Sequence, residues 1–157
     1  MHEFYAACYP RLVRVLTLVC GDQAEAEEVA QDAFVRLLPR WDKVSRYEDP
    51  EAWVRLVAFR LLSNRRRRAR NRLAALRRTG ASPDVAPPNG EGIDVMRALA
   101  TLPPEQRQVV VLHHLLDLPV EEVARVLRLP AGTVKSRLGR ARQSLSPLPR
   151  IEVPGRG

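Results

Sequence analysis

Residues 119–145 read PVEEVARVLRLPAGTVKSRLGRARQSL and contain two helical patterns separated by a short turn. In the first pattern, apolar residues recur at i, i+3, i+4 and i+7 and share one helix face; they are Val120, Val123, Ala124 and Leu127. The second pattern repeats this stripe at Val134, Leu138, Ala141 and Leu145. The intervening LRLPAGT is too short to let the helices separate. The stretch therefore predicts a helix-turn-helix, with Thr133 as the N-cap of the second helix.

The face of the second helix opposite its apolar stripe is basic. It carries Lys135, Ser136, Arg137, Arg140 and Arg142. The acids of this stretch, Glu121 and Glu122, belong to the first helix. A helix-turn-helix of this kind places its second helix in the major groove of DNA. An ordinary helical hairpin with a solvated basic face is the other interpretation, but the clustering of cations on the second helix favours DNA.

The net charge of +8 is distributed unevenly along the 157 residues. Residues 1–54 carry a net charge of −4, and residues 55–80 carry +10 without a single acid. Residues 81–119 carry −3, and residues 120–157 carry +5. Two basic blocks separated by acidic ones predict two contacts with a polyanion, and acidic faces available for another partner.

The composition argues against several classes of protein. We find no nucleophile paired with a base, no metal-ligand set and no Gly-rich phosphate loop, so the sequence predicts a protein that is not an enzyme and uses no cofactor or metal. On one helix, Cys8 and Cys20 would lie roughly 18 Å apart, whereas a disulfide needs Cα atoms within about 7 Å. We expect reduced thiols in a cytoplasmic protein. The sequence shows neither a signal peptide nor a membrane-spanning segment, so no membrane insertion is expected.

The N-terminal part of the chain predicts three helices. Residues 2–20 carry apolar residues at helical spacing, and Pro10 is expected to kink or split this helix. Residues 24–41 form a second pattern with one apolar side and one acidic side. A third helix opens at Pro50, a residue suited to the first helical position, and continues into the basic run at residues 63–78.

Residues 79–92, TGASPDVAPPNGEG, are rich in Gly, Pro and small polar residues and predict a flexible linker. This linker divides the chain into a domain at residues 1–78 and a domain at residues 93–146, followed by a tail at residues 147–157. No strand alternation is present in the sequence. The predicted fold is all-α: two small helical domains joined by a flexible linker, the second containing the helix-turn-helix.

Three stretches resemble bacterial RNA polymerase sigma factors of the extracytoplasmic-function branch. GTVKSRLGRAR, residues 132–142, resembles their region 4. AEAEEVAQDAFVRLL, residues 24–38, resembles the region 2 segment that docks on the clamp coiled coil of the polymerase. EDPEAWVRLVAFRLLSNRRRR, residues 48–68, resembles regions 2.3 and 2.4, which melt and read the −10 promoter element. Arg128 stands in the turn where the family usually has Gly.

The resemblance assigns three groups of site residues. It implies that Glu28, Gln31 and Asp32 face the polymerase. It implies contact with the −10 element by Lys43, Arg46, Tyr47, Arg60, Asn64, Arg65, Arg66, Arg67 and Arg68. It implies contact with the −35 element by Thr133, Lys135, Ser136, Arg137, Arg140 and Arg142. No residue is assigned a catalytic or metal-binding role.

Together, these features predict a sigma factor that binds core RNA polymerase and directs promoter recognition and transcription initiation. Its expected partners are core polymerase, promoter DNA and an anti-sigma factor that occludes the same surfaces. The alternative is a helix-turn-helix regulator that binds duplex DNA without polymerase. That alternative explains residues 119–145 equally well, but it leaves the acidic and Arg-rich helices without a shared purpose.

Overall fold

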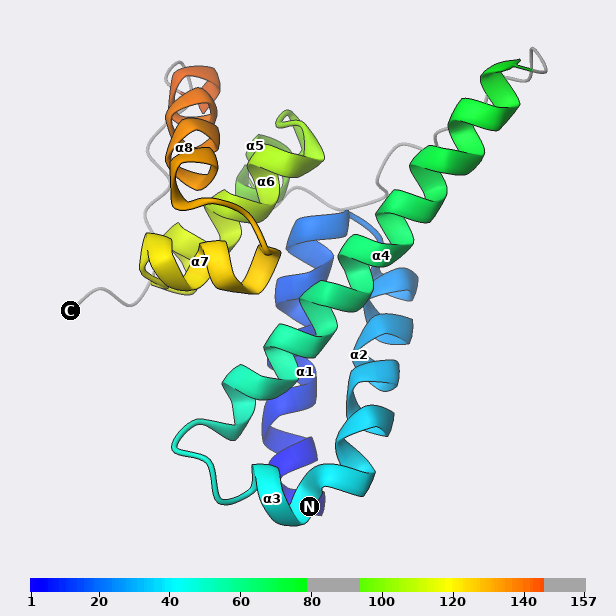
Figure 1. The fold of residues 1–157 in the computed structure, drawn as a ribbon, viewed down its shortest axis with the longest axis vertical. Helices are drawn as coiled ribbons and strands as arrows, with labels where there is room; N and C mark the ends of the chain where they lie inside the picture. Colours follow the sequence, from blue (N-terminus) through cyan, green and yellow to red (C-terminus); the bar gives the residue numbers. More distant parts are fainter. Residues whose placement is uncertain (79–93, 146–157) are drawn as a thin grey trace.

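The structure, a computed structural model, describes residues 1–78 and 94–145, and every regular element in these residues is helical (Figure 1). The N-terminal elements are α1 (His2–Cys20), α2 (Gln23–Leu37), the 3-10 turn η1 (Leu38–Arg40), α3 (Trp41–Val44) and α4 (Pro50–Arg78). The C-terminal elements are α5 (Asp94–Ala100), α6 (Pro104–Val110), the π-helical turn η2 (Val111–Leu115), α7 (Val120–Leu127) and α8 (Ala131–Leu145). The all-α prediction is confirmed for the described residues. The predicted linker and tail lie outside them.

Helix α1 runs unbroken through Pro10, so of the two expected effects of Pro10, a kink or a split, the split does not occur. Proline lacks the N–H that would bond the carbonyl four residues earlier. Buried residues on both sides of Pro10, among them Cys8 and Leu12, anchor the two parts of the helix in the core. Packing therefore offsets the missing hydrogen bond. Helix α1 ends at Gly21, whose φ of 73° is the left-handed conformation that suits glycine.

Helix α2 begins at a side-chain cap and ends at Leu37, just before Pro39. The Asp22 carboxylate accepts hydrogen bonds from the N–H groups of Ala24 (2.9 Å) and Glu25 (3.3 Å). The apolar pattern over residues 24 to about 41 extends past the end of the helix, where η1 and α3 follow α2 as separate short turns. Pro39 explains the change, because it cannot donate the hydrogen bond that would continue α2.

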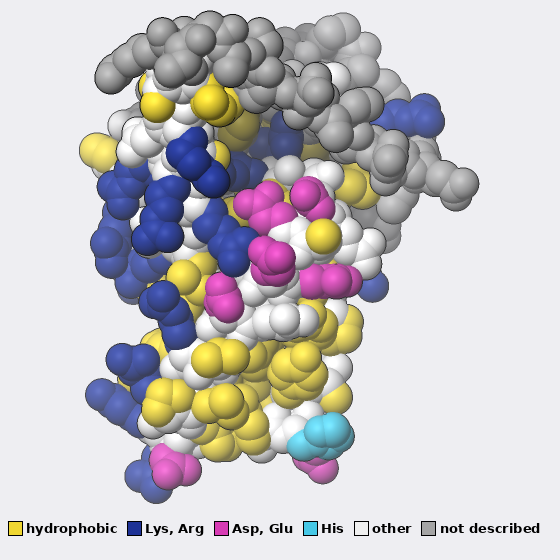
Figure 2. Space-filling view, turned by 90° about the vertical axis from the view of Figure 1, so that its right-hand side faces the viewer, with side chains coloured by type: hydrophobic (Ala, Val, Ile, Leu, Met, Phe, Trp, Pro, Cys, Tyr) yellow, Lys and Arg dark blue, Asp and Glu magenta, His cyan; other side chains and the backbone are white. Residues whose placement is uncertain are grey.

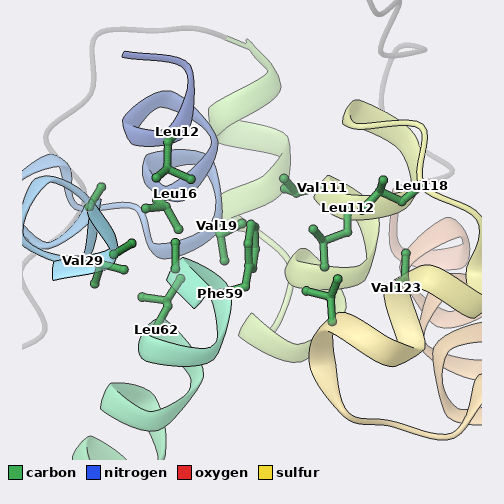
Figure 3. Packing of buried hydrophobic residues seen from close by; sticks show 14 of the residues in the cluster. Leu12, Leu16, Val19, Val29, Phe59, Leu62, Val111, Leu112, Leu118 and Val123 are labelled. Carbon is green, nitrogen blue, oxygen red and sulfur yellow. The ribbon is translucent and has the colours of Figure 1, made fainter. Parts of the chain in front are cut away.

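The N-terminal helices α1, α2 and α4 form a bundle, and the C-terminal helices pack against α1 and α4 at one side of it (Figure 1). The buried apolar residues of both parts make one continuous cluster (Figure 3). In this view, Phe59 of α4 lies between Leu16 of α1 and Leu112 of η2. The two predicted domains therefore share a core in this arrangement.

The guanidinium of Arg107 connects the two parts of the chain. Its Nε and Nη2 donate to the carbonyl oxygens of Leu99 (2.8 Å) and Leu102 (3.0 Å), where α5 ends. Its Nη1 donates to the carbonyl oxygen of Val19 in the last turn of α1 (3.2 Å). The last carbonyls of a helix lack partners within it. One side chain of α6 thus satisfies the ends of two helices, one from each part of the chain.

Candidate nucleic-acid interface

The helix-turn-helix consists of α7, a three-residue turn and α8. Arg128 adopts the left-handed conformation at φ 55° and ψ 48°. The N–H of Leu129 donates to the carbonyl of Ala124 (2.9 Å), and the N–H of Arg128 to that of Arg125 (3.4 Å). These two bonds form the Schellman arrangement that ends a helix and reverses the chain. Glycine adopts this left-handed conformation without strain, whereas Arg128 adopts it at a cost.

Helix α8 begins at Ala131, so the prediction that Thr133 is its N-cap is wrong. The carbonyl of Pro130 accepts from the N–H groups of Thr133 (3.0 Å) and Val134 (3.2 Å). Thr133 is consequently already in the first turn of the helix. The cause is the turn itself, because the Schellman bonds close the chain at Leu129 and let the helix start directly after Pro130.

One face of α8 is buried and the opposite face is open to solvent. Its buried residues are Val134, Leu138 and Ala141. Its exposed residues from the predicted −35 set are Lys135, Ser136, Arg140 and Arg142. The Ser136 hydroxyl donates to the carbonyl of Gly132 (3.0 Å), so this donor is already used within the helix. Thr133 and Arg137 are half-buried, and Arg137 lines a cleft between α8 and α4.

The four consecutive arginines of α4 have four different environments. Arg65 donates to the carboxylates of Glu28 (2.9 Å) and Asp32 (3.2 Å) on α2. Arg66 donates to the carbonyl of Val19 (2.7 Å), and Arg67 to the side-chain oxygen of Asn64 (3.2 Å). Arg68 is exposed and has no hydrogen bond or ion pair among the described residues. Arg68 and Arg67 are thus the members of this run that are freest to meet a phosphate.

Arg65 links the predicted −10 set to the predicted polymerase set. The hydrogen bond that Arg65 donates to Glu28, followed by the charges of Glu28 and Asp32, raises the pKa of Arg65 above its ordinary value. Its side chain is only about one-third exposed (34%), whereas those of Glu28 and Asp32 are more open, at 68% and 55%. The contact is therefore a partly solvated ion pair of modest strength that a partner can exchange.

The other predicted −10 residues occupy two places. Lys43 is exposed within α3, and Arg46 and Tyr47 are exposed between α3 and α4. Arg60 is half-buried, and its Nε is buried without a hydrogen-bond partner in residues 1–78 and 94–145. Arg60 lines a cleft of about 560 Å³, which also contacts Arg128 in the turn of the helix-turn-helix.

This cleft brings the two predicted DNA-binding elements together. One wall comes from α4 and includes Arg60, Asn64 and Arg67. The other wall comes from the end of α7 and the turn, including Arg128 and Leu129. In this arrangement, which we call closed because the two parts of the chain pack together, three residues of the predicted −10 set lie across the cleft from the turn of the helix-turn-helix. The sequence contained no signal for that proximity, because the two walls are far apart along the chain.

The predicted polymerase residues lie on the open side of α2. Glu28, Gln31 and Asp32 are exposed, and the Gln31 amide lies 3.5 Å from the Tyr9 hydroxyl of α1. Figure 2 shows acidic side chains gathered in a patch beside a band of Lys and Arg, with apolar side chains below the patch. The acidic face of α2 is therefore present as predicted.

An apolar area also belongs to this region, and sequence reasoning missed it. Val35 and Leu38, at 62% and 59% exposed, follow the acidic residues along the chain. Tyr5 stacks on Tyr9 with ring centroids 4.9 Å apart and meets the edge of Phe34 at 4.9 Å. The spacing of the two tyrosines, four residues apart on one helix face, was a usable signal.

The described residues contain neither a metal site nor a membrane-spanning helix. Among residues 1–78 and 94–145, no group of His, Cys, Asp or Glu side chains is arranged to hold a metal ion. Within the same residues, no helix has the length and apolar character needed to cross a membrane. Cys8 and Cys20 are both free thiols on α1, and burial raises the pKa of each.

Comparison with known proteins identifies both parts of the chain. The family Sigma-70 region 2 matches residues 4–72, and the family Sigma-70, region 4 matches residues 93–145. The ECF RNA polymerase sigma factor SigE of Mycolicibacterium smegmatis is 34% identical over 146 residues, covering 86% of this chain and 56% of that protein. The RNA polymerase sigma-E factor of Streptomyces avermitilis is 33% identical over 144 residues, covering 88% of this chain and 79% of that protein.

A solved structure shares the fold over almost the whole chain. It is the sigma factor RpoE from Bartonella quintana in complex with the anti-sigma factor NepR, with a TM-score of 0.69 and 21% sequence identity. The match covers 96% of this chain and 97% of that one. The chain spans just over half the length of the M. smegmatis relative. With both regions matched in order and relatives above 30% identity, this chain belongs to the extracytoplasmic-function sigma factors of the sigma-70 family.

Proposed function

We propose that this sigma factor binds core RNA polymerase through α2 and directs it to promoters through α4 and α8. The observation that carries the proposal is the exposed basic face of α8, anchored from behind by Val134, Leu138 and Ala141. A rigid helix with cations on its open face suits the DNA major groove. Its occurrence in one chain with region 2 supports a role in promoter recognition.

The proposal divides promoter contact between two elements. On α8, Lys135 and Arg140 reach base edges of the duplex −35 element, and Arg142 holds phosphate. On α4, Arg67 and Arg68 follow the backbone of the −10 element. Lys43 of α3 contributes as well, together with Arg46 and Tyr47 of the loop between α3 and α4. Phosphate contacts position a protein on DNA, whereas base-edge contacts carry sequence information.

Glu28, Gln31 and Asp32 form the proposed polymerase surface, together with the neighbouring apolar Val35 and Leu38. A polar area beside exposed apolar residues is the usual composition of a protein–protein interface. Arg65 holds two of the carboxylates in place from α4. The proposed polymerase contact is therefore adjacent to the proposed −10 contact.

An anti-sigma factor is the third proposed partner, and the cytoplasm is the proposed location. The structural relative RpoE was solved in complex with the anti-sigma factor NepR. We propose that this protein acts by binding and carries out no reaction of its own. A regulator that binds DNA without polymerase is the less favoured alternative, because it gives no role to region 2 or to the acidic face of α2.

Run-off transcription tests the proposal. Core RNA polymerase, purified free of other sigma factors, is supplied with a library of genomic fragments from the source organism, with and without this protein. We expect defined start sites only when the protein is present. The regulator alternative predicts retention of DNA fragments by the protein alone, no new transcripts, and no co-purification of polymerase subunits.

A further inference from the structure

A second cleft, of about 400 Å³, lies between α4, α6 and α8. This volume is within the range of roughly 300–1,000 Å³ that small-molecule sites occupy. Four arginines line it: Arg66, Arg70, Arg107 and Arg137. Glu105 is the one carboxylate on its wall among the described residues, and it pairs with Arg70 at 3.4 Å. The cleft therefore carries a clear excess of positive charge.

Two of these cations converge on a single acceptor. Arg66 and Arg107 both donate to the carbonyl oxygen of Val19, at 2.7 and 3.2 Å. Burial lowers the pKa of both side chains, and the charge of Arg107 lowers that of Arg66 further. Arginine nevertheless stays protonated in proteins. Two like charges are thus held beside one neutral oxygen, while Cys20 and, to a smaller extent, Glu25 and Glu105 act in the opposite direction on the pKa of Arg66.

The donor capacity of Arg66 is also incompletely used. Its Nη1 is buried and has no hydrogen-bond partner among the residues that the structure describes. A buried donor left unsatisfied costs about 1–3 kcal/mol. A water molecule would satisfy this N–H but would leave the charge uncompensated. An anion in the cleft would compensate the charge, and a guanidinium is well shaped to bind a phosphate group.

We propose that this cleft binds a small anion of the diphosphate class, either inorganic pyrophosphate or the diphosphate group of a nucleotide. The cleft exceeds the size of one phosphate, and its four cations come from three helices. A bound diphosphate would join α4 and α8, and so hold the closed arrangement of the chain. It would also occupy Arg66 and Arg137, one residue from each predicted DNA-binding set. The site does not depend on the proposed function in transcription.

Isothermal titration of the full-length protein with pyrophosphate tests the site, at constant ionic strength maintained with chloride. Arg137→Gln is the main variant, because Arg137 lines the cleft but makes no hydrogen bond or ion pair among the described residues. We expect it to weaken binding at least about tenfold, equivalent to ~1.4 kcal/mol. Arg72→Gln is the matched control, since Arg72 is exposed on α4 outside the cleft, and it should leave the affinity unchanged.

Arg66→Gln provides a second variant, with its folding checked by circular dichroism, and should abolish measurable binding. A nucleoside diphosphate in a parallel titration distinguishes the two sources. Tighter binding than pyrophosphate indicates a nucleotide site, and equal binding indicates a site for the diphosphate alone. Equal weakening by Arg72→Gln would show a diffuse basic surface and overturn the proposal. The proposal also fails if pyrophosphate does not bind while a single-stranded oligonucleotide does, because the arginines are then part of a DNA track.

Discussion

Arg128 holds a backbone conformation that glycine adopts without strain. Its φ of 55° lies in the left-handed region, at the point where α7 turns toward α8. For a residue with a Cβ atom this conformation costs roughly 1–2 kcal/mol. The turn is kept because its two Schellman bonds and the burial of α7 and α8 against each other depend on it. The strain is thus a local cost of the helix-turn-helix in this chain.

Arg128→Gly should raise the free energy of unfolding by about 0.5–1 kcal/mol, because glycine removes the strain but adds freedom to the unfolded chain. Urea unfolding followed by circular dichroism measures the change. Arg125→Gly, three residues earlier within α7, is the control and should lower the stability by about 1 kcal/mol. A loss of stability in Arg128→Gly would show that the Arg128 side chain stabilises the cleft more than its backbone strains the turn.

At the scale of elements, α4 and α8 present cations in different ways. Arg140 lies on the exposed face of a helix whose other face is fixed in the core, which suits the reading of base edges. Arg68 is exposed on a long helix and has no partner among the described residues. Arg66, by contrast, is held by the Val19 carbonyl. Arg68 is therefore the cleaner probe of phosphate contact on α4.

Arg140→Ala should cost about 1–3 kcal/mol in promoter binding and relax the preference at one upstream position. Arg68→Ala should weaken binding to all DNA sequences similarly. It should also reduce the slope of the logarithm of the binding constant against the logarithm of the salt concentration by about one unit. The measurement is binding of promoter fragments and single-base variants by the holoenzyme at several salt concentrations. The division of roles is refuted if Arg140→Ala weakens every variant equally, or if Arg68→Ala changes the preferred base.

The acidic face of α2 makes a separate prediction. Asp32→Lys should weaken binding of core polymerase by about tenfold or more. The substitution removes a proposed contact with the polymerase, and it also places a second positive charge beside Arg65. The loss of a charge at the rim of an interface would change the affinity less. Glu48→Lys is the matched control, since Glu48 is exposed outside α2. Surface plasmon resonance with immobilised core polymerase measures both. Unchanged affinity in Asp32→Lys, with normal helicity, would remove Asp32 from the interface.

At the scale of the whole molecule, the C-terminal helices pack directly against the N-terminal bundle. A continuous core joins α1 and α4 to α6, η2 and α7, and Arg107 ties the ends of α1 and α5 together. The cleft between α4 and α7 places Arg60 opposite Arg128. Among the residues that line this cleft, Arg60, Asn64 and Arg67 belong to the predicted −10 set and none belongs to α8.

Arg107→Gln tests how much the closed arrangement contributes to stability. The shorter amide leaves some of the carbonyls of Val19, Leu99 and Leu102 without donors, at a cost of about 1–3 kcal/mol. Arg97→Gln, an exposed change on α5, should stay within about 0.5 kcal/mol of the wild type. Differential scanning calorimetry should show one unfolding transition for the wild type and a lower or divided one for Arg107→Gln. Identical traces for the two variants would mean that Arg107 does not hold the parts together.

The sequence by itself determined the features that depend on local periodicity. The stripe of Val134, Leu138 and Ala141 repeats at helical spacing, and all three residues are buried. The helical class, the helix-turn-helix and the acidic face of α2 follow from the same kind of pattern. Each needs only neighbours within a few turns of one helix, so a single stretch of chain carries the information.

Only the tertiary structure decided what each arginine does. Arg65, Arg66 and Arg67 are identical in chemistry, but successive residues are turned by about 100° around a helix. They therefore meet a carboxylate pair, a helix end and a neighbouring amide, respectively. Arg107 bonds Val19 across 88 positions of sequence. No local pattern encodes such partners, because they depend on which distant element the packing of the core places opposite each side chain.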